Sequence, residues 1–133
     1  EVEASLSALR GLGPSRLIAV FQPHLYSRTR AFSQEFGSAL ALADEVIVLD
    51  VYPAREEPVG PFEGVSGLDV LRATADRRGA TRNWWAPDLD AAERAVEGLL
   101  APGRILVTVG AGDVTRLSDR LVAGDAGNSG SLA

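Results

Sequence analysis

Three apolar runs of strand length constrain the fold of this chain most strongly. They lie in the segments 17–21, 45–50 and 105–109. Continuous runs of this kind are typical of parallel strands that are buried on both faces. Between them, apolar residues recur at spacings of three and four, which predicts amphipathic helices over 27–43 and 88–100. This alternation of strand and helix predicts an α/β fold with a parallel sheet and right-handed crossovers.

The remaining segments give weaker patterns. They predict a helix over 2–9, an irregular connection over 51–66, a helix over 68–75, a short strand over 80–85 and a last helix with Leu117, Leu121 and Val122 on its inner face. The expected architecture is doubly wound, with a mostly parallel sheet and helices on both faces. We expect one domain over 1–123 and a flexible tail over 124–133.

Composition excludes several classes of protein. The net charge of −5 and the pI near 4.8 disfavour binding to nucleic acid or to an anionic membrane. No apolar run approaches the roughly 20 residues of a membrane span, and no signal for export precedes the first helix, so we expect a cytoplasmic protein. The chain has no cysteine, and all 13 of its basic residues are arginine, which excludes thiolate metal sites and a phosphate-loop lysine. Because it starts at Glu1 and lacks methionine, we expect a fragment of a longer protein.

Positive charge gathers in one part of this acidic chain. No acidic residue occurs between Glu3 and Glu35, a stretch that contains four arginines and the only histidine, His24. A locally basic surface suits a small anionic ligand. Chance clustering of arginines on a solvated face is the alternative, and sequence alone leaves both open.

In doubly wound sheets, ligands bind beyond the carboxyl ends of the strands. That rule places the segments 22–28, 50–55 and 110–113 on one edge of the predicted sheet. Arg28 lies four residues before Phe32, so it is expected to share the buried stripe of its helix and to point toward the strand ends. A guanidinium there can clamp a carboxylate through two hydrogen bonds. On spacing alone, an ordinary ion pair with an acid such as Asp50 is the commoner outcome.

Other candidate groups have weaker signals. His24 is either an acid–base group or a loop histidine that bonds to the backbone, and it has no metal-ligand spacing to a carboxylate. The turn Gly110-Ala111-Gly112 matches a dinucleotide-binding pattern poorly, because its third glycine position is Thr115. Asp113 is expected to cap the following helix. Glu56 and Glu57 are expected on the solvated surface without a role, and no residue is expected to be catalytic or to ligate a metal.

Several segments resemble one protein family. The segment 20–30, VFQPHLYSRTR, resembles the FQPHxYSRT signature of the UDP-N-acetylmuramate:L-alanine ligases, a branch of the Mur ligase family. The segment 49–58, LDVYPAREEP, is similar to the family's DVYPAxExP loop, and 109–113, VGAGD, to its GAGD or GAGN turn. Residues 1–4 resemble the sequence after a histidine-rich segment of the family. The resemblance covers nearly the whole chain in order.

The resemblance implies a Rossmann-like carboxy-terminal domain of an ATP-dependent ligase of peptidoglycan synthesis. Such an enzyme joins L-alanine to UDP-N-acetylmuramate through an acyl phosphate, with ATP and Mg²⁺ bound mainly outside this fragment. The partners implied are the enzyme's own central ATPase domain and its amino-terminal UDP-sugar domain. The isolated fragment is expected to be inactive. The residues implied in substrate binding are Arg28, His24, Gly110, Ala111, Gly112 and Asp113, with Gln22, Asp50 and Tyr52 on the ATP side.

Some alternatives remain open beside this resemblance. Leu25 stands where a second arginine is frequent in the family, so the carboxylate clamp is expected to rely on Arg28. A related ligase that recycles murein tripeptide has a similar domain but a different turn at this position. A stand-alone nucleotide-binding or regulatory module, and a domain that serves only as an interaction surface, are further alternatives.

Overall fold

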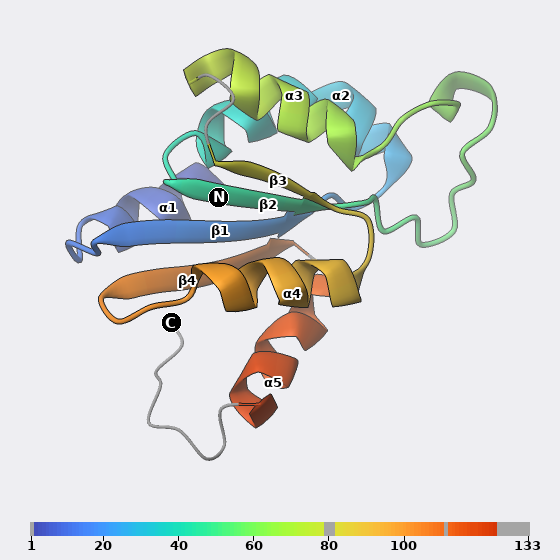
Figure 1. Ribbon diagram of the computed structural model, residues 1–133. Helices are drawn as coiled ribbons and strands as arrows, with labels where there is room; N and C mark the ends of the chain where they lie inside the picture. Colours follow the sequence, from blue (N-terminus) through green and yellow to red (C-terminus); the bar gives the residue numbers. More distant parts are fainter. Residues whose placement is uncertain (1, 79–81, 111, 125–133) are drawn as a thin grey trace.

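Strands and helices alternate along the chain (Figure 1). The structure, a computed structural model, describes residues 2–78, 82–110 and 112–124. The elements are α1 (Val2–Arg10), β1 (Arg16–Gln22), α2 (Tyr26–Leu40), β2 (Glu45–Leu49), the 3₁₀ turn η1 (Gly60–Phe62), α3 (Gly67–Arg78), β3 (Asn83–Ala86), α4 (Leu89–Leu99), β4 (Arg104–Gly110) and α5 (Val114–Gly124). Each strand that the sequence predicts is present.

The strands form one parallel sheet in the order β3-β2-β1-β4. The chain moves outward from β1 through β2 to β3 and then returns to the other side of β1 with β4. This reversal makes the carboxyl ends of β1 and β4 the topological switch point of the sheet. The predicted doubly wound α/β fold is therefore confirmed for the described residues.

Helices cover both faces of the sheet, as predicted (Figure 1). On one face, α4 and α5 pack over a cluster that includes Ile18, Val20 and Ile47. On the other face, side chains of α1, α2 and α3 pack over a cluster that includes Leu17 and Ala19. Successive residues of β1 thus enter opposite cores, which explains why the strand is apolar without interruption.

Helix α2 departs from the prediction in two ways. It ends at Leu40, and the chain then turns so that the Asp44 carboxylate accepts the Leu17 N–H at 2.7 Å. Phe32, which was expected in the buried stripe, is 45% exposed. The stripe instead runs through Thr29, Gly37 and Leu40, because the carboxyl half of α2 lies against α3 as well as against the sheet.

The other differences are small. The predicted strand over 80–85 is β3, which starts at Asn83, whereas residues 80 and 81 lie outside the described residues. Helix α5 reaches Gly124, the first residue of the predicted tail over 124–133. The side chain of Val122 and residues 125–133 lie outside the described residues. Within the described residues, no helix has the length and apolar character needed to cross a membrane.

The two tryptophans lie next to each other on the edge strand β3. Trp84 is 40% exposed, and its indole N–H donates to the buried Glu45 carboxylate at 3.3 Å. Trp85 points to the other face of the strand, where it is half-buried and packs with the core that contains Phe21 and Val48.

Candidate functional site

The three segments predicted at the carboxyl edge of the sheet meet there in the structure. His24 and Tyr52 form a parallel bridge that extends the pairing of β1 and β2 beyond the strands. The Tyr52 N–H donates to Pro23 O at 2.8 Å, and the Leu25 N–H donates to Tyr52 O at 2.9 Å. The rings of His24 and Tyr52 stack with centroids 6.0 Å apart. The two motifs thus form one continuous piece of structure.

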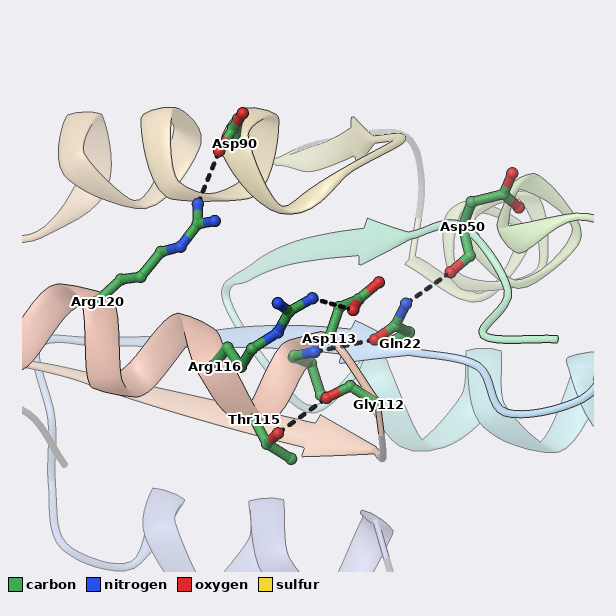
Figure 2. A network of polar contacts seen from close by, with 9 residues as sticks. Gln22, Asp50, Asp90, Gly112, Asp113, Thr115, Arg116 and Arg120 are labelled. Carbon is green, nitrogen blue, oxygen red and sulfur yellow. Dashed lines mark hydrogen bonds and ion pairs between the residues drawn. The ribbon is translucent and has the colours of Figure 1, made fainter. Parts of the chain in front are cut away.

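The buried side chain of Gln22 links the elements that form this edge. Its side chain is 4% exposed, and its amide nitrogen donates to Asp50 O at 3.2 Å. Its amide oxygen accepts the Val114 N–H at the start of α5 at 2.9 Å. Figure 2 shows Gln22 between the end of β2 and the first turn of α5. One buried amide therefore ties together the ends of β1 and β2 and the start of α5.

Asp50 supports the start of α3. Its carboxylate accepts the Val51 N–H at 2.8 Å and the Gly67 N–H at 3.1 Å. Gly67 lies so close to Leu49 O that an added Cβ would overlap it. Within the described residues, Asp50 makes no ion pair with Arg28, so the ion pair that spacing favoured is not formed.

The turn after β4 packs tightly against Tyr52. Gly112 has a φ of +92°, and an added Cβ would overlap the Tyr52 ring. The Asp113 carboxylate at the start of α5 pairs with Arg116, and the Thr115 hydroxyl donates to Gly112 O at 2.8 Å (Figure 2). Ala111 lies outside the described residues. The Tyr52 ring thus fills the space beside this turn, at the edge of the sheet where ligands bind in doubly wound domains.

Helix α2 begins without a capping side chain of its own. Its N-cap residue is Leu25, which has a φ of +68° and a ψ of +136°, a conformation that favours glycine. Thr29 is fully buried, and its hydroxyl donates back to Leu25 O at 2.8 Å. Thr29, although it can act as a helix cap, therefore does not cap α2 with its side chain.

Glu56 caps α2 from the loop that follows β2. One carboxylate oxygen accepts the Ser27 N–H at 2.9 Å, and the other accepts the Ser27 hydroxyl. The two hydrogen bonds from Ser27 and a further one from the Tyr26 N–H hold the pKa of Glu56 below its usual range. Glu56 is half-buried, so its placement on a solvated surface without a role is corrected. The separation of 29 residues left no local signal for this contact.

Arg28 lies on the first turn of α2 with its side chain exposed. Its guanidinium carbon is 5.8 Å from the centroid of the Phe32 ring, and both residues lie outside the buried stripe. It makes no ion pair with a described residue, whereas Arg30 donates to Pro61 O at 3.0 Å. Arg28 is therefore a cation available to an external anion, although it does not occupy the buried face that the sequence predicted.

The edge is suited to binding rather than to metal chemistry. In the parts of the chain that the structure describes, no group of three or more His, Asp or Glu side chains is placed to hold a metal ion. The groups that face outward near the switch point are the half-buried His24 and Tyr52 and the exposed Arg28. Such an arrangement can hold and orient a small anionic molecule against a rigid base.

Comparison with known proteins gives a consistent result. Residues 1–112 match the sequence model described as Mur ligase, glutamate ligase domain. The chain is 50% identical over 126 residues to the UDP-N-acetylmuramate–L-alanine ligase of Mycobacterium avium and 51% identical over 124 residues to that of Saccharopolyspora erythraea. Each alignment covers 92% of this chain and 24% of the relative, so the chain spans about a quarter of the length of the curated relatives it matches.

A solved structure has the same fold. It is a crystal structure of a domain assigned to a UDP-N-acetylmuramate:L-alanyl-γ-D-glutamyl-diaminopimelate ligase from Haemophilus ducreyi. The TM-score is 0.62 with 18% identity, and the match covers 92% of this chain and 80% of that chain. At this identity the likeness supports the architecture alone.

Proposed function

Because this chain belongs to the Mur ligase family, we propose that it is the carboxy-terminal domain of an ATP-dependent ligase that joins L-alanine to UDP-N-acetylmuramate. The relatives of about 50% identity carry that name, and the FQPH, DVYPA and GAGD segments of this chain meet at one edge of the sheet. The parent enzyme would act in peptidoglycan synthesis, and through it in cell-wall growth and cell division, in the cytoplasm.

The proposed reaction needs little chemistry from this domain. ATP phosphorylates the muramoyl carboxylate, the amine of L-alanine attacks the acyl phosphate, and phosphate leaves as the amide forms. The phosphate loop and the groups that hold Mg²⁺ would belong to the central ATPase domain, and no step is assigned to a metal on this chain. This domain would contribute by positioning the amino acid when it closes on its partner domains.

The exposed position of the Arg28 guanidinium is the main structural support for this proposal. The exposed Arg28 guanidinium, which has no ion-pair partner among the described residues, lies on the first turn after β1 and is suited to a bidentate contact with the carboxylate of L-alanine. Leu25 occupies the position of a second arginine that is frequent in the family, so Arg28 would hold the carboxylate without it. Arg28 also lies at the helix terminus whose dipole favours negative charge.

The other proposed site residues would shape the surroundings of the substrate. His24, Gly110, Ala111, Gly112 and Asp113 are proposed as further substrate-binding residues. Gln22, Asp50 and Tyr52 are proposed on the ATP side. Because Gln22 and Asp50 already bond within the chain, their part would be to fix the edge that ATP approaches.

The first test measures phosphate release from ATP by the parent enzyme with UDP-N-acetylmuramate present. L-alanine, glycine, L-serine and murein tripeptide are added in turn. Release that depends on L-alanine supports the proposal, and release only with tripeptide identifies the recycling ligase instead. If no phosphate is released with any of these acceptors, both ligase assignments are wrong.

Arg28 is then the residue to change. Arg28→Ala is expected to raise the KM for L-alanine by about tenfold or more while the KM for ATP stays within about twofold, since a charged hydrogen bond contributes about 1.5 to 3 kcal/mol. Arg30→Ala is the matched control, because Arg30 is an exposed arginine of the same helix that bonds to Pro61 O. Equal changes in the KM for L-alanine and the KM for ATP would show that Arg28 does not bind L-alanine specifically.

A further inference from the structure

The contact between Glu56 and Ser27 has no part in the proposed reaction, yet it is placed directly beside Arg28. Glu56 belongs to the long connection between β2 and α3, and Ser27 belongs to the first turn of α2. The two carboxylate oxygens of Glu56 each accept one hydrogen bond from Ser27. One oxygen accepts the main-chain N–H, and the other accepts the hydroxyl. The next residue in the chain is Arg28.

The first turn of α2 needs support from outside the helix. Leu25 enters the helix at a positive φ, and it provides no side-chain cap. A positive φ is unfavourable for a residue other than glycine, and such a conformation persists only where surrounding contacts hold it. The main-chain bonds between Tyr52 and residues Pro23 and Leu25 hold one end of this turn. Glu56 holds the other end at Ser27.

A carboxylate is well suited to this position. It accepts hydrogen bonds from N–H groups that the helix leaves free, and its charge is favourable at a helix N-terminus. The lowered pKa of Glu56 means that the folded chain favours the charged form of this carboxylate. The contact also fixes the loop over 50–58 to the helix, so that the DVYPA and FQPH segments are joined at two places instead of one.

We propose that Glu56 is a positioning residue of the amino-acid site: it locks the first turn of α2 and thereby sets the direction of the Arg28 guanidinium. This inference rests on the proposed function of Arg28. Glu56 does not touch the substrate in this scheme, and it acts only through Ser27 and the backbone that carries Arg28.

The opposite role is the sharpest competitor. Since Glu56 is itself a carboxylate at the start of α2, it could occupy the place of the substrate carboxylate and leave when L-alanine binds. The two roles differ in sign. If Glu56 positions Arg28, removing the Glu56 carboxylate raises the KM for L-alanine. If Glu56 competes with the substrate carboxylate, removing it lowers the KM for L-alanine.

The decisive experiment compares Glu56→Gln with Glu57→Gln in the parent enzyme. Glu57 is an exposed neighbour of the same charge, and its side chain has no hydrogen bond or ion pair with the described residues. We expect Glu56→Gln to raise the KM for L-alanine about tenfold, with the KM for ATP changed less than about twofold. Glu57→Gln should match the wild type. Ser27→Ala removes only the hydroxyl bond, and its KM for L-alanine should lie between those of wild type and Glu56→Gln.

A second measurement does not depend on turnover. Hydrogen exchange of the same proteins, followed by mass spectrometry, is expected to be faster in the peptide that covers residues 25–30 of Glu56→Gln and unchanged in Glu57→Gln. Unchanged exchange with an unchanged KM for L-alanine overturns the inference, and so does a lowered KM. If the wild-type parent shows no turnover with L-alanine, the proposed function fails while the exchange data still decide whether Glu56 locks the turn.

Discussion

At the scale of single residues, two carboxylates organise the starts of two elements. Glu56 bonds to the start of α2, and Asp44 bonds to the Leu17 N–H of β1 while pairing with Arg10 at 2.9 Å. Burial alone would raise the pKa of Asp44, but the hydrogen bonds from Arg10 and the Leu17 N–H and the charges of Arg10 and Arg16 outweigh it, so the pKa is lowered. Both groups therefore stabilise the folded chain in their charged form.

The pH dependence of stability follows from these two groups. In the unfolded chain they titrate near their ordinary pKa values of 4.5 for Glu56 and 3.8 for Asp44, and in the fold each pKa is lower. The unfolded state then binds more protons, so their contribution is complete above those values and is lost as pH falls through the folded pKa values. Urea unfolding of this chain between pH 7 and pH 3 should show stability falling below about pH 4.5.

Variants separate this effect from general acid unfolding. Glu56→Gln and Asp44→Asn should each lower stability at pH 7 and flatten its decline toward pH 3, because the titrating group is gone. Glu57→Gln should decline as the wild type does. A decline in Glu56→Gln as steep as in the wild type would show that Glu56 gives no charge-dependent stability.

Prediction from the sequence was least accurate for the contacts of single side chains. The segments that form the edge were placed correctly because each directly follows a strongly apolar strand. The cap on α2 was missed because Glu56 and Ser27 are neighbours only after the sheet has formed. Arg28 was assigned to a buried stripe through Phe32, but the buried side of this part of α2 is the one that carries Thr29, so the side chains of Arg28 and Phe32 stay exposed.

At the scale of elements, the packing of α2 against α3 depends on the absence of a side chain. A Cβ added to Gly37 would lie 2.5 Å from the Ala73 Cβ and close to the backbone of α3. Gly98 in α4 is the matched position, since nothing lies within 4 Å of its added Cβ. The same substitution thus meets opposite surroundings in two helices of one domain.

We expect Gly37→Ala to lower the free energy of unfolding by about 1 to 3 kcal/mol, because the helices must move apart. Gly98→Ala should raise it by about 0.5 kcal/mol through its higher helix propensity. Thermal and urea unfolding of the two variants beside the wild type test this contrast. A neutral Gly37→Ala would mean that α2 and α3 are not in close contact in solution.

The elements themselves followed from the sequence to different degrees. The strands β1 and β2 were predictable because their apolar runs are buried on both faces. The apolar run of β4 also predicted a strand, but β4 lies at an edge of the sheet and most of its residues are half-buried, so the expected burial on both faces is wrong for this strand. The strand β3 was harder to place, since its exposed Trp84 and its short length resemble a loop with two aromatic residues. The end of α2 was predicted three residues too late because Ala43 is buried by the turn that follows the helix.

At the scale of the whole molecule, the switch point is closed to a nucleotide in the isolated domain. The Tyr52 ring fills the space beside Gly112, and the Val114 N–H already donates to the Gln22 amide oxygen. Each of these features disfavours a bound phosphate. A stand-alone nucleotide-binding module is therefore the weaker alternative.

Calorimetry tests this at the same scale. The 133-residue chain should give no heat of binding with ATP or ADP at concentrations up to about 1 mM, where a Kd of 1 mM corresponds to about −4.1 kcal/mol. The parent enzyme, measured in the same buffer with Mg²⁺, is the positive control. Saturable heat from the isolated chain would restore the nucleotide-module hypothesis.

The position of the tryptophans decides what intrinsic fluorescence can report. Both indoles lie on β3, and β2 and β1 separate that strand from β4. Tryptophan fluorescence from this domain therefore reports structural changes at the β3 edge of the sheet. Trp84 reports contact with solvent, and Trp85 reports the core beneath α3. An optical probe of events at the opposite margin, beside Gly112, would have to be introduced there.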